Sequence, residues 1–156
     1  MQVQIKEELL ERIASRRYVV GIVGLGYVGL PLLSAFHKQG FSLIGVDIDA
    51  AKIEAFRAGK SYIKHFATSD MEELRDSPRA QATTDFSALS EADAIVICVP
   101  TPLTKHREPD MSYVVQTSKA IAPYLKRGNL VVLESTTYPG TTDEIIRPIC
   151  EGVSGL

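Results

Sequence analysis

Short apolar runs and longer amphipathic stretches alternate along this chain. The runs are rich in valine and isoleucine and end at glycine, proline or an acid, which is typical of strands buried on both faces of a parallel sheet. A fifth, more polar run at 80–85 predicts a strand near a sheet edge. The four apolar runs lie at 18–24, 41–47, 93–102 and 129–136.

The segments between these runs carry apolar residues at helical spacing, and several end at glycine. Strands that alternate with helices predict a parallel sheet covered by helices on each side. The expected fold class is therefore α/β, a Rossmann-type doubly wound parallel sheet in a single domain. We expect that domain over residues 18–156, preceded over 1–17 by a short amphipathic helix with Ile5 and Leu9 on its apolar side.

The charge of the chain narrows its possible partners. Its 17 basic and 19 acidic residues are well mixed and give a net charge of -2, so no one-signed surface is expected to hold nucleic acid or an anionic membrane. No apolar run approaches the roughly 20 residues that a bilayer span needs. A cytoplasmic location is the expectation.

The cysteines and histidines form no recognisable metal or catalytic set. Cys98 and Cys150 are 52 positions apart, with no Cys-x-x-Cys motif, so we expect two buried thiols and no metal site. His37 falls on a predicted helix and His65 and His106 in loops, and all three are expected to be exposed.

The stretch "GIVGLGYVGLP" places Gly24, Gly26 and Gly29 between an expected strand and an expected helix. Three glycines at a turn can serve backbone geometry alone. In this position they also match a dinucleotide-binding turn, in which the first glycine makes the turn, the second allows close approach of a pyrophosphate and the third lets helix and strand pack. The free amides at the start of the helix would then face the phosphates.

Asp47 ends the next expected strand, 18 residues after Gly29. An acid at that position accepts hydrogen bonds from ribose hydroxyls and repels a 2'-phosphate, which favours NAD over NADP. Lys52 lies close enough in sequence to weaken that preference. The alternative is that Asp47 only ends a strand, as Asp49 is expected only to cap the following helix.

Two later strand ends carry hydroxyl groups at the edge where ligands of such sheets bind. Thr101 follows one strand, and Ser135 and Thr136 follow another. These hydroxyls would either face the nicotinamide half of a dinucleotide or be satisfied by nearby backbone. The spacing alone does not choose between these two roles.

The segments "GIVGLGYVGLP", "GVDID", "ICVPTPL", "EPDMSYV" and "LESTTYPGTT" occur together in the order and spacing of one family. Over about residues 18–149 the chain resembles the N-terminal NAD-binding domain of the UDP-glucose/GDP-mannose dehydrogenases. "GKSYIKH" and "ESTTYPGTT" look most like the UDP-N-acetylglucosamine 6-dehydrogenase branch. UDP-glucose and GDP-mannose 6-dehydrogenases are the alternatives.

The resemblance implies oxidation of the C6 alcohol of a nucleotide sugar to a carboxylate in two NAD-dependent steps, through an aldehyde held as a thiohemiacetal and then a thioester on a cysteine. It implies that Thr136 assists by placing a catalytic water or proton. The residues that it assigns to the cofactor are Gly24, Gly26, Tyr27, Val28, Gly29, Asp47, Lys52, Pro100, Thr101, Pro102, Ser135 and Thr136.

The family's nucleophilic cysteine, its catalytic lysine and asparagine, and its sugar-binding domain have no counterpart in these 156 residues. The chain alone is therefore expected to bind NAD but to be inactive, with the UDP-sugar bound by the missing domains and a homo-oligomer formed by the full-length protein. A different hypothesis is a stand-alone NAD-binding or sensing module, because every matched residue belongs to cofactor binding.

Overall fold

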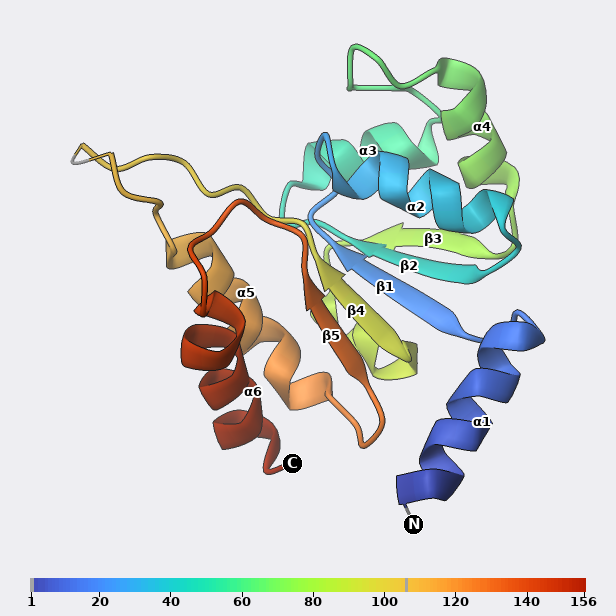
Figure 1. Cartoon of the computed structure of the whole chain (residues 1–156). Coiled ribbons are helices and arrows are strands. Elements are labelled where there is room, and N and C mark those ends of the chain that lie inside the picture. The colour runs from blue at the N-terminus through green and yellow to red at the C-terminus, as the bar shows by residue number, and fades with distance from the viewer. Residues whose placement is uncertain (1, 106) are drawn as a thin grey trace.

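The structure, a computed structural model, describes residues 2–105 and 107–156 and is built around one sheet of five parallel strands (Figure 1). The strand order is β3-β2-β1-β4-β5. This arrangement confirms the predicted doubly wound parallel sheet. The strands are β1 (Val19–Val23), β2 (Ser42–Val46), β3 (Ala80–Thr83), β4 (Ala94–Ile97) and β5 (Leu130–Leu133).

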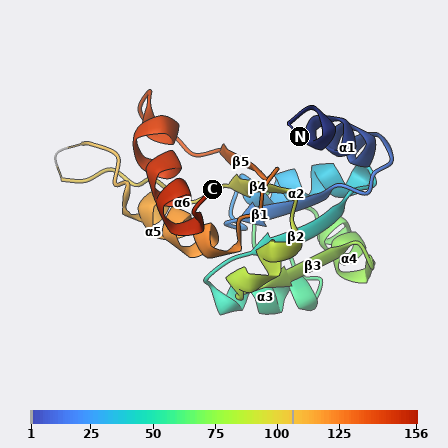
Figure 2. The same ribbon diagram turned by 90° about the horizontal axis from the view of Figure 1, so that it is seen from below.

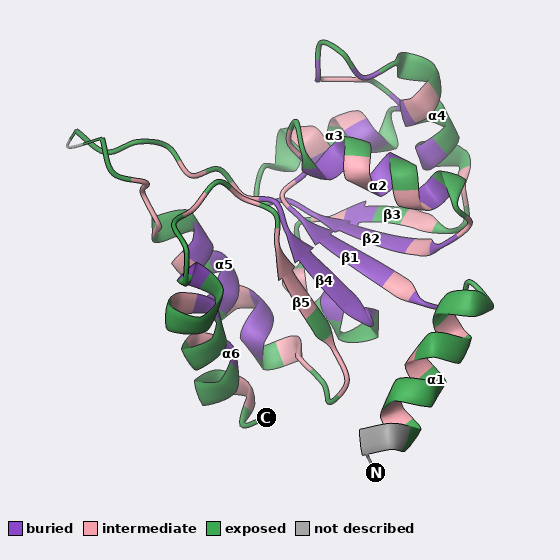
Figure 3. Ribbon diagram, viewed as in Figure 1, coloured by how far each residue is buried: buried purple, intermediate pink, exposed green. Residues whose placement is uncertain are grey.

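The three inner strands β2, β1 and β4 are almost wholly buried, as expected for apolar runs in a parallel sheet. All of β4 is buried, and β1 is buried from its second residue onward (Figure 3). The register places Gly21 of β1 between Ile44 of β2 and Ile95 of β4. The polar run at 80–85 forms β3, which is an edge strand as expected.

Helices cover both faces of the sheet. Leu30, Ile53 and Met71, from three helices on the first face, lie in one core cluster, and Leu9 packs against it. These helices and the N-terminal helix are α2 (Gly29–Lys38), α3 (Ala50–Arg57), α4 (Thr68–Asp76) and α1 (Gln2–Ala14).

The second face is covered by later parts of the chain, and α5 and α6 lie together on the side of the molecule opposite α1 (Figures 1 and 2). Leu89, Val114 and Cys150 share a second core cluster with strand residues such as Ile95. One turn of π-helix leads directly into α6. These elements are η1 (Phe86–Glu91), α5 (Ser112–Ile121), η2 (Ala122–Tyr124), η3 (Thr142–Ile146) and α6 (Arg147–Ser154).

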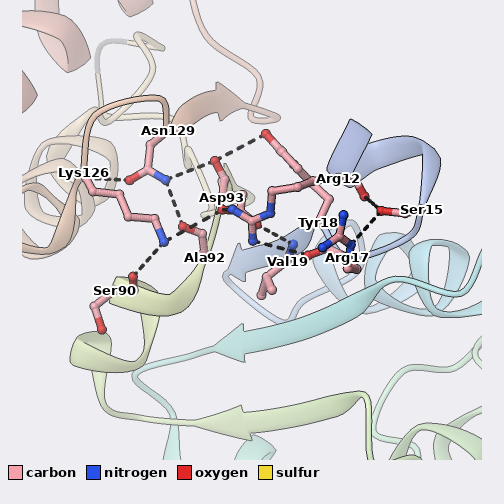
Figure 4. A network of polar contacts seen from close by, with 10 residues as sticks. All are labelled: Arg12, Ser15, Arg17, Tyr18, Val19, Ser90, Ala92, Asp93, Lys126 and Asn129. Atoms are coloured by element: carbon pink, nitrogen blue, oxygen red, sulfur yellow. Dashed lines mark hydrogen bonds and ion pairs between the residues drawn. The ribbon is translucent and has the colours of Figure 1, made fainter. Parts of the chain in front are cut away.

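A polar network at the amino ends of the strands holds α1 against the domain (Figure 4). Asp93 is 2% exposed, and its carboxylate accepts hydrogen bonds from Arg12 Nη1 at 2.6 Å and from the Val19 N–H at 2.9 Å. The Asn129 side chain donates to the Asp93 carbonyl at 3.1 Å. The carboxylate is therefore satisfied although it is buried, and one of its partners comes from α1.

His37 does not have the predicted exposure. The residue is 4% exposed, with Nε2 at 2.8 Å from Ser77 Oγ and Nδ1 at 3.4 Å from a carboxylate oxygen of Glu73. The reason is helical periodicity: His37 follows Leu30 by seven residues and Leu33 by four, so it lies on the buried stripe of α2. His65 is exposed, as expected, and His106 lies outside the described residues.

Both cysteines are buried and unpaired, as predicted. Among residues 2–105 and 107–156, no helix is both long and apolar enough to cross a membrane.

Candidate functional site

A cavity of about 790 Å³ opens at the carboxyl ends of β1 and β4. Those two strands are neighbours, yet β1 leads to β2 on one side whereas the chain runs on from β4 to β5 on the other. The place where the direction of the strand order reverses is called the topological switch point, and ligands of open parallel sheets bind just outside it. The volume lies in the range of roughly 300–1,000 Å³ that is usual for small-molecule and cofactor sites.

Gly24 and Gly29 are required by the packing of the turn between β1 and α2. Gly24 has φ +95°, and a Cβ added there would lie 2.5 Å from the carbonyl oxygen of Cys98. A Cβ on Gly29 would lie 1.8 Å from the carbonyl oxygen of Gly24. Neither position accepts a side chain without movement of the backbone, so these two glycines have a structural reason to be present.

Gly26 differs from the other two glycines. A Cβ added there would meet no atom within 4 Å, and the residue lines the cavity. No packing contact in the described chain therefore requires glycine at this position. Close approach of a ligand to the backbone would require it, as for the second glycine in a dinucleotide-binding turn.

The start of α2 follows directly on this turn. Its N-cap residue, Val28, makes no side-chain capping hydrogen bond, and an early backbone bond of the helix runs from the Leu30 N–H to the Gly26 carbonyl at 3.1 Å. The first amides of a helix have no partner within it, and the helix dipole favours negative charge there. This end of α2 is therefore suited to bind a phosphate group.

Asp47 lies beside the glycine turn and is 5% exposed. Its Oδ2 accepts from the Leu25 N–H and from Lys52 Nζ, both at 2.8 Å, and its Oδ1 accepts from the Asp49 N–H at 2.9 Å. The carboxylate is thus oriented by three donors, and Oδ1 has capacity for a further one. Asp49 caps α3 through the Ala51 N–H, as predicted.

The hydroxyls at the ends of β4 and β5 tie these two strand ends together. Thr101 Oγ1 donates to the Thr136 carbonyl at 2.7 Å, and Ser135 Oγ donates to the Val99 carbonyl at 2.8 Å. The hydroxyl protons of Thr101 and Ser135 are therefore donated to backbone carbonyls, which is one of the two roles that the spacing left open. Their oxygens can still accept a hydrogen bond.

Cys98 forms part of the cavity wall but is not a nucleophile in this structure. Burial, together with the nearby negative charge of Glu134, raises the pKa of its thiol to about 11. A reactive cysteine needs exposure and a lowered pKa. The thiol of Cys98 therefore contributes apolar surface to the cavity.

The structure brings most of the sequence-predicted cofactor residues together around this cavity, with two differences. Gly29 lies behind the turn and acts through packing, and Pro102 is exposed and does not line the cavity. The predicted residues that line it are Gly24, Gly26, Tyr27, Val28, Asp47, Lys52, Pro100, Thr101, Ser135 and Thr136.

Sequence reasoning did not include several other residues of the cavity wall. Tyr62 comes from the segment after α3, and Tyr113 and Gln116 come from α5. Ile48 is 76% exposed although it is apolar and directly follows Asp47. The sequence alone shows only that Ile48 lies between Asp47 and Asp49, just past the end of a strand.

The parallel sheet, the switch-point cavity and the glycine turn beside Asp47 define a dinucleotide-binding domain of the Rossmann class. Residues 18–155 match the UDP-glucose/GDP-mannose dehydrogenase family, NAD binding domain. The chain belongs to this family, and the match confirms both the expected family and NAD as the cofactor.

Individual relatives agree with this assignment. The chain is 38% identical over 137 residues to a UDP-N-acetyl-D-glucosamine 6-dehydrogenase of Pseudomonas aeruginosa, covering 88% of this chain and 32% of that protein. It is also 38% identical over 136 residues to a UDP-N-acetyl-D-mannosamine dehydrogenase of Yersinia pestis, covering 85% of this chain and 31% of that protein.

Among solved structures, a GDP-mannose dehydrogenase from Pseudomonas aeruginosa matches with a TM-score of 0.83 and 32% identity, over 88% of this chain and 33% of that one. The chain thus spans about a third of the length of the relatives that it matches.

Proposed function

We propose that this chain is the NAD-binding part of a nucleotide-sugar 6-dehydrogenase that oxidises the C6 alcohol of a UDP-sugar to a carboxylate in two steps, with UDP-N-acetylglucosamine as the favoured substrate. The observation that carries the proposal is Gly26, whose open side faces the switch-point cavity beside Asp47. The 38% identity to the UDP-N-acetyl-D-glucosamine 6-dehydrogenase of Pseudomonas aeruginosa supports this choice of sugar.

In this proposal the cavity has a phosphate end and a ribose end. Gly24 makes the turn, and Gly26 and the uncapped start of α2 present amides to the pyrophosphate, with Tyr27 and Val28 at the rim. Asp47 accepts from the ribose hydroxyls of the adenosine, and Lys52 donates beside it. A 2'-phosphate would meet the buried negative charge of Asp47, so NAD is preferred to NADP.

The nicotinamide half of the cofactor would lie at the part of the cavity lined by Pro100, Thr101, Ser135 and Thr136. Bound NAD supplies a hydride acceptor there. The oxygens of Thr101 and Ser135 accept hydrogen bonds from the cofactor, and Thr136 holds a water or proton near the reacting carbon. Parts of the protein beyond these residues bind the sugar and supply the nucleophilic cysteine. The full-length protein forms a homo-oligomer in the cytoplasm.

Calorimetric titration of the chain with NADH and NADPH tests the proposal, with Asp47→Asn as the variant and Asp49→Asn as its control. We expect tighter binding of NADH than of NADPH. A hydrogen bond to a charged group contributes about 1.5–3 kcal/mol, so Asp47→Asn should reduce the preference about 10- to 100-fold. Asp49→Asn should keep it, because asparagine also caps a helix.

Two results would contradict the proposal: no binding of NADH, or an unchanged preference in Asp47→Asn. Incubation with NAD and UDP-N-acetylglucosamine should yield no NADH from the chain alone. Turnover by the unaltered chain would show that the catalytic residues are not missing.

A further inference from the structure

The segment between α3 and α4 reaches back over the cavity and is firmly anchored. It leaves α3 through Gly59, which has φ +66° and whose N–H donates to the Phe56 carbonyl at 3.0 Å. Ile63 and Phe66 are 7% and 9% exposed and belong to the core cluster under α2. Tyr62, between these anchors, is therefore held in a defined place on the cavity wall.

The hydroxyl of Tyr62 contacts the glycine turn directly. It donates to the carbonyl oxygen of Leu25 at 2.8 Å, across 37 positions of sequence. The N–H of the same Leu25 donates to Asp47 Oδ2 at 2.8 Å, and its side chain is fully buried. The backbone of Leu25, between Gly24 and Gly26, is thus held from both sides.

The Leu25 carbonyl matters because of the peptide to which it belongs. The described chain has no cis peptide bonds, and a trans peptide holds its carbonyl and its N–H in opposite directions. Anchoring the Leu25 carbonyl therefore also orients the N–H of Gly26. Glycine turns are mobile unless they are held, and a donor that is already oriented costs less to order when a ligand binds.

The donor is protonated under all ordinary conditions. Burial raises the pKa of the Tyr62 hydroxyl, and the negative charges of Asp47 and Asp49 raise the pKa further. The hydroxyl keeps its proton and donates it to the carbonyl, which can only accept.

We propose that Tyr62 is a positioning residue for cofactor binding: its hydroxyl holds the Leu25–Gly26 peptide in the orientation that receives the pyrophosphate. This inference rests on the proposed function. Tyr62 acts through the turn, so it affects ligands that carry the pyrophosphate and leaves recognition of the nucleoside by Asp47 unchanged.

The test is Tyr62→Phe in the 156-residue chain, with Tyr18→Phe as a matched control. Tyr18 is more deeply buried than Tyr62, and its hydroxyl also lies near a backbone carbonyl, that of Asp93 at 3.4 Å, but at the opposite end of the sheet. Both changes remove one hydroxyl and keep the ring. Dissociation constants are measured for NAD, for ADP and for adenosine, which lacks phosphate.

We expect Tyr62→Phe to weaken NAD and ADP by the same factor, about 3- to 10-fold, as for the loss of one ordinary hydrogen bond, and to leave adenosine unchanged. Tyr18→Phe should leave all three constants unchanged. Amide hydrogen exchange should be faster at Leu25 and Gly26 in Tyr62→Phe only. A general loss of stability would not produce this difference between ligands.

Unchanged NAD and ADP affinity in Tyr62→Phe would overturn the inference and leave the proposed function intact. An equal loss of adenosine affinity would also overturn it, because Tyr62 would then act on the nucleoside or on the whole cavity. Failure of the unaltered chain to bind NAD would instead refute the proposed function, and this inference with it.

Discussion

Substitution of Gly26 and of Gly29 separates the structural role of the glycine turn from its role in ligand binding. A methyl group on Gly26 meets no atom within 4 Å, and this residue does not have a positive φ. Replacement of glycine by alanine at such a position stabilises a protein by about 0.4–1 kcal/mol, because the unfolded chain loses freedom. Gly26→Ala should therefore raise the melting temperature by about 1–4 °C.

The same change at Gly29 should have the opposite effect on stability. The new methyl group would lie 1.8 Å from the Gly24 carbonyl oxygen and 3.2 Å from Ile22 Cγ2. The better helix propensity of alanine contributes only about 1 kcal/mol, whereas α2 would have to move away from β1 to relieve the overlap. We expect a loss of about 3 kcal/mol or more in the free energy of unfolding.

The assays are thermal unfolding followed by circular dichroism and calorimetric titration with NADH. Gly26→Ala should fold at least as well as the unaltered chain and bind NADH at least about tenfold more weakly, because its methyl group occupies the path of the phosphates. A Gly26→Ala chain that is clearly less stable would refute the packing argument. One that binds NADH normally would refute the assignment of this turn to the phosphates.

Three further predictions concern α1, Tyr62 and the two thiols. Arg12→Ala should lower the free energy of unfolding by about 2–3 kcal/mol in urea titrations, because Asp93 stays buried without its closest partner, and should leave NADH affinity unchanged. The pKa of Tyr62 is raised above the 10.0 of a free tyrosine, so above about pH 10 the unfolded chain loses a proton that the folded chain keeps, and the free energy of unfolding falls. In urea titrations, Tyr62→Phe should make this fall shallower by up to about 1.4 kcal/mol per pH unit. An unchanged slope would contradict the raised pKa. Burial raises the pKa of Cys98 and Cys150, so dithionitrobenzoate near pH 8 should label both only after denaturation, and fast labelling of the native chain would show that they are accessible.

The parts of the fold that depend on local pattern could be predicted from the sequence. Apolar strands that alternate with helices specified a parallel sheet, and the polar 80–85 run specified an edge. The neighbouring positions of the Gly24 turn and Asp47 followed as well, because parallel strands bring their carboxyl ends to one edge. His37 was predicted wrongly although its spacing from Leu30 and Leu33 places it on the buried stripe.

The remaining features depend on contacts between distant parts of the chain. Arg12 and Asp93 are 81 positions apart, and Tyr62 and Leu25 are 37 positions apart. No periodicity or motif connects such residues before the fold brings them together. For the same reason the sequence could not show that the Thr101 hydroxyl would be used by the backbone of Thr136.

We propose that this chain binds NAD at the switch-point cavity and that Asp47 selects against a 2'-phosphate. The most direct measurement is a calorimetric titration of the unaltered chain with NADH and, in parallel, with NADPH. We expect one NADH per chain, bound more tightly than NADPH. Equal affinities for the two nucleotides, or no binding of either, would contradict it.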